Sequence, residues 1–351
     1  MLPDWISLDC VLPSERHKEA ALARQDQLTK PRGALGRLEQ VAVTLAALQA
    51  TETPSAERAP ILLFAGDHGI AAQGVSAYPP EVTVQMLRSF ATGGAAIAVL
   101  ARTLGCSLHV VDAGTLASEV IPGVIIDKPR HGTRDFSREP ALSEAEVAFA
   151  LECGRRAVAR LADHAPELII LGEMGIGNTT AAAAIAAALL PCPPVDIVGS
   201  GTGLDGEGRA RKARVIADAL ALHGLTSGAP AEDVLGAVGG LEILAITGAM
   251  ISAAQQRVPV LVDGFIVSVA ALVAVKLTPS CRPWLMFAHR SAERGHGIVL
   301  DALDARPLID LDLRLGEASG AAIALPLLRM ACALHNEMAT FAEAAVSGRE
   351  T

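Results

Sequence analysis

The stretch ELIILGEMGIGNTTAAAAIAAALL, residues 167–190, decides the fold. Residues 168–171 form a short apolar run rich in β-branched side chains, which is typical of a strand buried on both faces. Residues 181–190 are an unbroken block of strong helix formers. The intervening turn, 172–177, carries three glycines and is followed by Asn and Thr residues suited to a helix N-cap. Such a strand, turn and helix N-terminus can bind an anion, most often phosphate, and a tight turn that binds nothing is the alternative.

The same rhythm of apolar strand, turn and helix recurs along the chain. Strands are predicted at 61–70, 107–115, 121–127, 168–171, 195–198, 258–264 and 283–289. Helices are predicted at 14–28, 36–48, 81–88, 93–102, 143–162, 181–190, across 209–214, and at 239–256, with a polar helical turn at 301–306 and a last helix reaching about 345. Repeated βα units predict an α/β fold with a mostly parallel, Rossmann-like sheet covered by helices on both faces.

Composition narrows the class of protein. The 351 residues carry a net charge of −9, so no basic patch is indicated and nucleic acid is not expected as a partner. Six scattered cysteines without a CxxC pair argue against structural zinc and indicate reduced thiols in a cytoplasm. Residues 258–275 are apolar, but Pro259, Asp263 and Gly264 favour strand, turn and helix over a membrane span. No membrane partner, metal or cofactor is expected.

Polar residues collect where the predicted strands end. They are Asp67, His68, Asp112, Glu173, Ser200, Asp263, His289 to Ser291, and Glu317. Ligands bind at the carboxyl ends of strands in open α/β sheets, so a site is predicted at this edge.

Two glycine loops predict one phosphate site within it. Gly175–Thr179 is the first loop and Gly199–Gly203 the second, and Lys212 can carry its ammonium group back toward them. The alternative is that 209–214 form a solvated helix face. Neither loop matches the P-loop or the dinucleotide fingerprint, which weakens a nicotinamide dinucleotide site.

Glu317, in the segment LGEASGAA, is open to two interpretations. As a first-turn carboxylate it would interact with the helix dipole, worth about 0.3–1 kcal/mol. As a general base it would stand at the edge of the cleft. His289 and His296 lie seven residues apart without a third ligand nearby, so they give little support for a metal site.

Several motifs, in this order and over nearly the whole chain, resemble the family of nicotinate-nucleotide–dimethylbenzimidazole phosphoribosyltransferases. They are KPRGALGRLE (31–40), GDHGIAAQGVSAYPPEVTVQM (66–86), LGEMGIGNTT (171–180), GSGTG (199–203), VDGFI (262–266) and LRLGEASGA (313–321). The sequence departs from the family pattern at Arg32, Ala34 and Ala98, and Ala77 replaces a hydroxyl in the expected base pocket. The resemblance covers the motifs that carry both glycine loops and Glu317.

The resemblance implies transfer of phosphoribose from nicotinate mononucleotide to 5,6-dimethylbenzimidazole, or a related base, in assembly of the lower ligand of cobalamin. The products would be α-ribazole 5′-phosphate and nicotinate. The implied protein is a cytoplasmic homodimer that needs no cofactor. Its fold is a large catalytic domain, 55–320, with a small helical domain from 1–54 and 321–351.

The resemblance also implies roles for particular residues. Glu317 would be the catalytic base. The base pocket would contain Tyr78, Gln85, Leu171 and Leu315. Phosphate and ribose would contact Glu173, Gly175, Gly177, Gly201, Gly203 and Lys212. The nicotinate side would hold Asp263, Gly264 and Ser291. A nucleotide-dependent oxidoreductase and a non-catalytic nucleotide-binding module are the alternative functions, and the second would not need Glu317.

Overall fold

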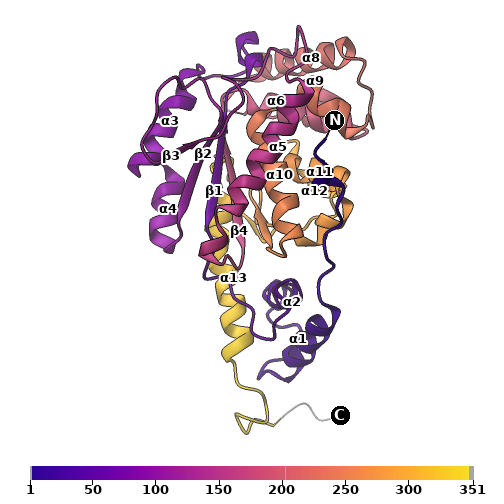
Figure 1. Ribbon diagram of the computed structural model, residues 1–351. Coiled ribbons are helices and arrows are strands. Elements are labelled where there is room, and N and C mark those ends of the chain that lie inside the picture. The colour runs from indigo at the N-terminus through magenta and orange to yellow at the C-terminus, as the bar shows by residue number, and fades with distance from the viewer. Residues whose placement is uncertain (1, 202, 348–351) are drawn as a thin grey trace.

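The centre of the molecule is a six-stranded, all-parallel sheet with strand order β3-β2-β1-β4-β5-β6 (Figure 1). The computed structural model describes residues 2–201 and 203–347. The strands are β1 Ile61–Gly66, β2 Leu108–Gly114, β3 Val124–Ile126, β4 Ile169–Met174, β5 Val260–Val262 and β6 Leu285–Phe287, and a separate parallel pair joins β7 His289–Arg290 to β8 Ile309–Asp310. The chain builds outward from β1 to β3, then returns to β4 on the other side. The order therefore reverses between β1 and β4, where open α/β sheets bind ligands.

Helices cover both faces of the sheet, as the sequence predicts. One core contains α5 Glu144–Ala159, α6 Asn178–Leu189, α10 Leu241–Gln255 and α11 Phe265–Leu277. The opposite core contains α2 Arg37–Gln49, α3 Glu81–Thr92, α4 Ala96–Leu104 and α13 Ser319–Glu337. Because side chains alternate along a strand, Leu62 and Phe64 of β1 enter the first core, while Ile61 and Leu63 enter the second.

Helices α5 and α10 meet at two glycines. A Cβ added to Gly248 would collide with the backbone of Leu151, and one added to Gly154 would collide with the backbone of Ala245 and Ala249. The missing side chains therefore allow the two helix backbones to touch, and the packing between them leaves no room for a methyl group.

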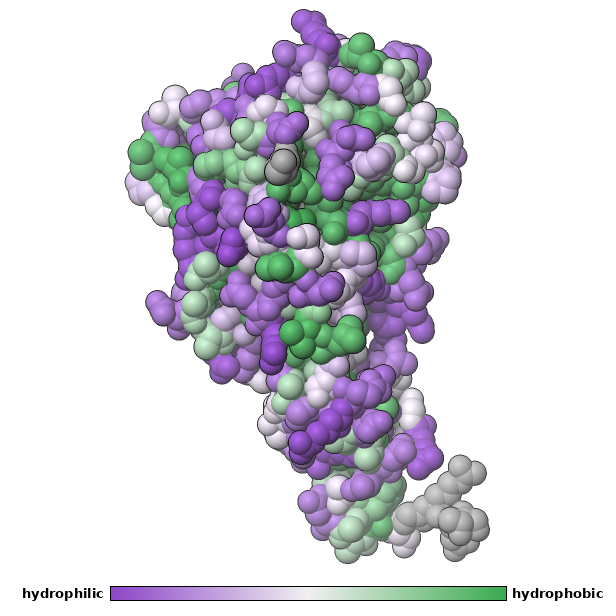
Figure 2. Space-filling view, turned by 45° about the vertical axis from the view of Figure 1, so that its right-hand side comes forward, coloured by the Kyte–Doolittle hydropathy of each residue, from purple (hydrophilic) through white to green (hydrophobic). Residues whose placement is uncertain are grey.

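A smaller helical lobe projects from the sheet domain (Figures 1 and 2). It contains α1 Glu15–Gln27, α2 and the end of α13, and Arg24 of α1 donates hydrogen bonds to the backbone carbonyls of His335 and Asn336. The first segment, η1 Asp4–Ser7, packs instead on the large lobe, where Gln255 donates to the Trp5 carbonyl at 2.8 Å. The domain limits given by the resemblance stay a prediction.

The structure corrects several predicted elements. Residues 195–198 are not a strand but belong to the short helix α7 Pro194–Ile197, because proline at its first positions fixes a helical φ. The last helix ends at Glu337, not near 345, because the following residues pair with the end of α1 through a Leu28–Thr340 bridge. The turn predicted at 301–306 is the end of α12 His296–Ala302.

Two helices differ from the sequence-based expectation. They are α8 Gly206–Leu222, which is longer than expected, and α9 Ala231–Val238, for which no helix was predicted. By length and composition the stretch Glu81–Leu104 could cross a membrane. It consists of α3 and α4, which are interrupted at Gly93, where φ is 83°.

Candidate functional site

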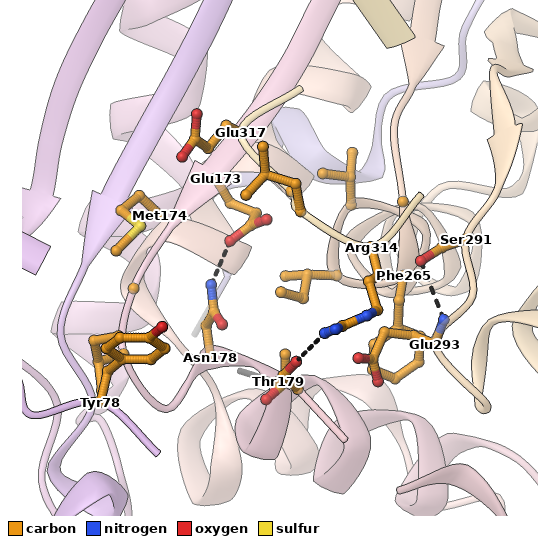
Figure 3. Close-up of a pocket in the computed structure, with 18 of the residues that line it drawn as sticks. Tyr78, Glu173, Met174, Asn178, Thr179, Phe265, Ser291, Glu293, Arg314 and Glu317 are labelled. Atoms are coloured by element: carbon orange, nitrogen blue, oxygen red, sulfur yellow. Dashed lines mark hydrogen bonds between the residues drawn. The ribbon is translucent and has the colours of Figure 1, made fainter. Parts of the chain in front are cut away.

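A cavity of about 370 Å³ opens at the carboxyl edge of the sheet. Its walls come from the end of β4, the first turn of α6, the first turn of α11 and the loop that precedes α13 (Figure 3). It is lined by Tyr78, Glu173, Met174, Gly175, Ile176, Asn178, Thr179, Gly201, Gly264, Phe265, Ile266, Val267, His289, Ser291, Glu293, Arg314, Leu315, Gly316 and Glu317. Segments far apart in the sequence thus meet at the carboxyl edge of the sheet, the edge at which the sequence predicts a site.

Eight of the residues singled out from the sequence line this cavity: Tyr78, Glu173, Gly175, Gly201, Gly264, Ser291, Leu315 and Glu317. Others lie outside it. Leu171 is fully buried and forms no part of the cavity wall, because its side chain packs into the helix-covered core beneath β4. Gln85 is exposed on α3 away from the cavity lining. Gly203 lines a neighbouring cavity, and Gly177 is the N-cap of α6 with φ 97°.

Glu317 stands on a left-handed segment of backbone. Gly316, Glu317 and Ala318 have φ of 88°, 61° and 67°. The left-handed conformation costs a residue with a Cβ roughly 1–2 kcal/mol, and such outliers concentrate at functional sites. Ala318 is the N-cap of α13, so Glu317 precedes the helix and is not a first-turn carboxylate. This geometry removes the helix-dipole interpretation in the form that the sequence suggested.

The Glu317 carboxyl is largely buried and weakly hydrogen-bonded. The backbone N–H of Ile97 donates to it at a long 3.5 Å. Burial raises the pKa of this carboxyl, the Ile97 bond opposes the shift, and the charge of Asp263 adds to it. A carboxylate with a raised pKa on the wall of a cavity is suited to accept a proton.

Glu173, the next-to-last residue of β4, lines the cavity beside Glu317, and its carboxylate lies against Gly316 (Figure 3). Asn178 donates a hydrogen bond to its Oε2, and the two side chains point toward each other in Figure 3. Burial, followed by the charges of Asp263 and Glu242, raises the pKa of Glu173 to about 8. A Cβ on Gly316 would collide with Glu173 Oε1, so only glycine fits there. Near neutral pH the Glu173 carboxyl therefore carries a proton and can donate a hydrogen bond.

Asp263 and His289 hold the first turn of α13 in place. Asp263 Oδ1 accepts the backbone N–H of Ala321 at 2.8 Å and lies 3.4 Å from His289 Nε2. A Cβ on Gly320 would collide with the His289 ring. Asp263 thus fixes the helix that follows Glu317, and it does not itself line the cavity.

Lys212 lies behind the opposite wall. It is 1% exposed, and its Nζ donates to Thr179 Oγ1 at 2.6 Å. Burial lowers the pKa of Lys212 to about 8, against the opposing charge of Glu293. The solvated-face interpretation holds for Arg209, Arg211 and Arg214, which are exposed, and fails for Lys212.

The strand-end aspartates outside the cavity brace loops. Asp67 Oδ2 accepts the N–H of Leu116 at 2.8 Å. Asp112 accepts the N–H groups of Gly114 and Thr115, and Lys128 Nζ lies 2.6 Å from its Oδ2. These carboxylates bond to backbone and to Lys128, so they shape the loops around the site.

The two histidines with seven-residue spacing do not form a metal site. His296 Nδ1 accepts the N–H of Ser291 at 2.8 Å, and its Nε2 bonds Ser268 Oγ at 2.9 Å. Across residues 2–201 and 203–347, no group of three or more His, Cys, Asp or Glu side chains is arranged to hold a metal ion.

Sequence reasoning missed several residues of the cavity: Asn178 as a partner of Glu173, Phe265, Glu293 and Arg314. Arg314 comes from the same loop as Glu317 and donates to the Gly201 carbonyl at 3.4 Å. It lies in the LRLGEASGA motif that carried the resemblance, and a cation beside Glu317 in that motif was the signal that could have found it.

Known proteins share this sequence and architecture. The profile of a family described as Phosphoribosyltransferase matches residues 10–346. A nicotinate-nucleotide–dimethylbenzimidazole phosphoribosyltransferase of Bradyrhizobium sp. (strain BTAi1) is 76% identical over 350 residues, covering 100% of both chains. One of Pseudomonas aeruginosa PAO1 is 57% identical over 346 residues, covering 98% of both.

Solved structures agree with the sequences. The crystal structure of the enzyme of that name from Thermus thermophilus has a TM-score of 0.90 and 44% identity, covering 96% of this chain and 100% of that one. A second structure, of CobT from the same organism, has a TM-score of 0.90 and 46% identity, covering 95% and 99%. Family profile, full-length relatives and fold coincide: the chain belongs to the phosphoribosyltransferase family whose members are named nicotinate-nucleotide–dimethylbenzimidazole phosphoribosyltransferases.

Proposed function

We propose that this protein transfers phosphoribose from nicotinate mononucleotide to 5,6-dimethylbenzimidazole or a related base. The products are α-ribazole 5′-phosphate and nicotinate, and the reaction serves assembly of the cobalamin lower ligand. The observation that carries the proposal is Glu317, a buried carboxyl on left-handed backbone at the wall of the switch-point cavity. The names of the relatives support the two substrates.

The chemistry needs one base. The bond from the ribose carbon to the pyridinium nitrogen breaks, and nicotinate departs with a neutral ring, so its nitrogen needs no proton. A benzimidazole nitrogen forms the new bond, and the other ring nitrogen must lose its proton. Glu317 accepts this proton, and its raised pKa keeps it basic enough to do so. Glu173, which lies beside Glu317 and is protonated near neutral pH, donates a hydrogen bond to the substrates.

The other residues around the cavity contact different parts of the two substrates. Tyr78 and Leu315 give the benzimidazole an apolar and aromatic border, and Figure 3 has Tyr78 across the cavity from Arg314. The 5′-phosphate binds at the Gly175 turn and the first turn of α6, where Lys212 contributes its charge through Thr179. Gly264 and Ser291 border the nicotinate. A homodimer in the cytoplasm is part of the same proposal.

The test is release of nicotinate from nicotinate mononucleotide, with and without dimethylbenzimidazole, by wild type and Glu317→Gln. Release should require the base, and Glu317→Gln should lose about 10²–10⁴-fold in kcat with a smaller change in KM. Glu167→Gln is the matched control, since Glu167 accepts hydrogen bonds from Ser55, Glu57 and Arg58 away from the cavity. Absence of release by wild type with any benzimidazole would refute the reaction. Unchanged turnover in Glu317→Gln would refute the assigned base.

A further inference from the structure

A buried, hydrogen-bonded histidine–glutamate pair lies next to the Gly175 turn of the cavity and has no role in the chemistry above. His68 Nε2 donates to Glu242 Oε1 at 2.7 Å, and both side chains are 0% exposed. His68 follows β1, and Glu242 lies in the first turn of α10, where the helix dipole favours a carboxylate. Burying two polar side chains costs free energy, and the hydrogen bond between them offsets part of that cost.

Two glycines make room for the pair, and two more lie against His68. A Cβ on Gly240 would lie 2.5 Å from His68 Cε1, and one on Gly66 would lie 2.6 Å from Glu242 Oε2. A Cβ on Gly177 would lie 3.0 Å from His68 Cβ. A Cβ on Gly175 would collide with the Gly66 carbonyl oxygen and would lie in ordinary contact with His68 Cδ2, at 3.5 Å. The last two glycines belong to the turn between β4 and α6, so the side chain of His68 packs directly against that turn.

The turn has one further support. The N–H of Ile176 donates to Thr83 Oγ1 at 3.0 Å, which fixes the turn from the side of α3. Gly175 and Ile176 line the cavity, while His68 and Glu242 do not. His68 therefore supports the turn from below without access to substrate.

The pair also lies next to other acidic side chains. Asp67 and Glu173 are the other titratable groups that face it; burial raises the pKa of both, and the charge of Glu242 adds to the shift. Glu242 Oε2 and His68 Nδ1 have no hydrogen-bond partner within the described part of the chain. The hydrogen bond between the two residues is thus the polar contact that holds the ring of His68 in place.

We propose that His68 and Glu242 are a positioning pair that holds the Gly175–Gly177 turn in the shape that receives the phosphate of the mononucleotide. The inference rests on the proposed assignment of the phosphate to this turn. His68 supplies the surface under the glycines, and Glu242 locks the orientation of the ring. The pair acts on binding of the mononucleotide, whereas Glu317 acts on the chemical step.

The experiment measures steady-state constants for each substrate and calorimetric binding of nicotinate mononucleotide. His68→Ala should raise KM and Kd for the mononucleotide at least tenfold, while kcat at saturation and KM for dimethylbenzimidazole stay within threefold. His68→Gln keeps a donor for Glu242 and should recover most of the affinity, and Glu242→Gln should give an intermediate loss. His335→Ala removes a buried histidine of the small lobe, paired with Gln25 at 2.9 Å, and should leave both constants unchanged.

The outcomes separate this inference from the proposed reaction. If wild type turns over and His68→Ala keeps its mononucleotide affinity, or loses affinity for both substrates equally, the positioning role is wrong. If wild type binds the mononucleotide but no base releases nicotinate, the reaction is wrong, and the mononucleotide affinities of His68→Gln and Glu242→Gln still decide the role of the pair. Those two variants also decide it if His68→Ala does not fold.

Discussion

Replacing Glu173 with glutamine should flatten the dependence of stability on pH. The folded-state pKa of Glu173 is about 8, against an ordinary value of 4.5. This difference of about 3.5 units corresponds to about 5 kcal/mol, as an upper value for a fully buried carboxyl. Because the folded protein holds this proton more tightly than the unfolded chain, the stabilising contribution is complete below about pH 4.5. It is lost as the pH rises through about 8.

The assay is urea unfolding at pH 5, 6, 7, 8 and 9, followed by the fluorescence of the two tryptophans. Relative to wild type, Glu173→Gln should gain stability between pH 5 and about 8, by up to about 4 kcal/mol over these three pH units, and should gain no more above pH 8, because glutamine has no proton to lose. The gain should be smaller to the extent that Asp263 and Glu317 share the proton.

Glu39→Gln is the control. Burial of Glu39 is outweighed by hydrogen bonds from Lys30 and the Leu35 N–H, so its pKa is lowered and its contribution is lost only below about pH 4.5; the free energies of unfolding of Glu39→Gln and wild type should therefore run parallel between pH 5 and 9. If the unfolding free energies of wild type and Glu173→Gln run parallel between pH 5 and 9, the protonated state assigned to Glu173 is wrong.

Two further changes test other parts of the structure. Gly248→Ala should lower the free energy of unfolding by about 1–3 kcal/mol or more, because the added Cβ would collide with the Leu151 backbone. Gly206→Ala is the matched control, since its Cβ meets nothing within 4 Å. Equal urea midpoints for the two variants would contradict the packing argument. In calorimetry, binding of the mononucleotide by wild type should weaken as the pH rises through about 8, where Lys212 loses its charge. Lys212→Met should bind the mononucleotide weakly at every pH. The same pH dependence in both proteins would rule out Lys212 as the phosphate cation.

The fold was predictable wherever local pattern and tertiary role agree. The apolar runs at 61–66 and 169–171 are strands buried on both faces, and nothing competes with that interpretation. The run at 195–198 is also apolar but follows two prolines, which favour a helix start. The end of α13 depended on a contact with the end of α1, more than 300 residues earlier, which no local pattern reveals.

The glycines and the acid of the site were predictable from the sequence. Which of the predicted residues line the cavity and which lie behind its wall was less predictable. Motif positions brought Glu317, Glu173 and Gly175 to one cavity. They did not separate lining residues from supporting ones: Lys212 and Asp263 stand one layer behind the wall, and Leu171 lies inside the sheet. The partner of His68 is 174 positions away, so the pair under the glycine turn could not be inferred from spacing.

Helix α13 comes late in the sequence, and both the position of the proposed base and the cover of the sheet depend on it. The six-stranded sheet is complete in sequence at Phe287, yet the proposed base is residue 317 and the helix that fixes it comes last. Until α13 is synthesised, the face of β1 that carries Ile61 and Leu63 lacks part of its cover. A nascent or truncated chain ending before α13 therefore exposes apolar sheet surface and has no anchored acid. Helix α13 therefore both anchors the segment of the proposed base and completes the cover of this face of the sheet.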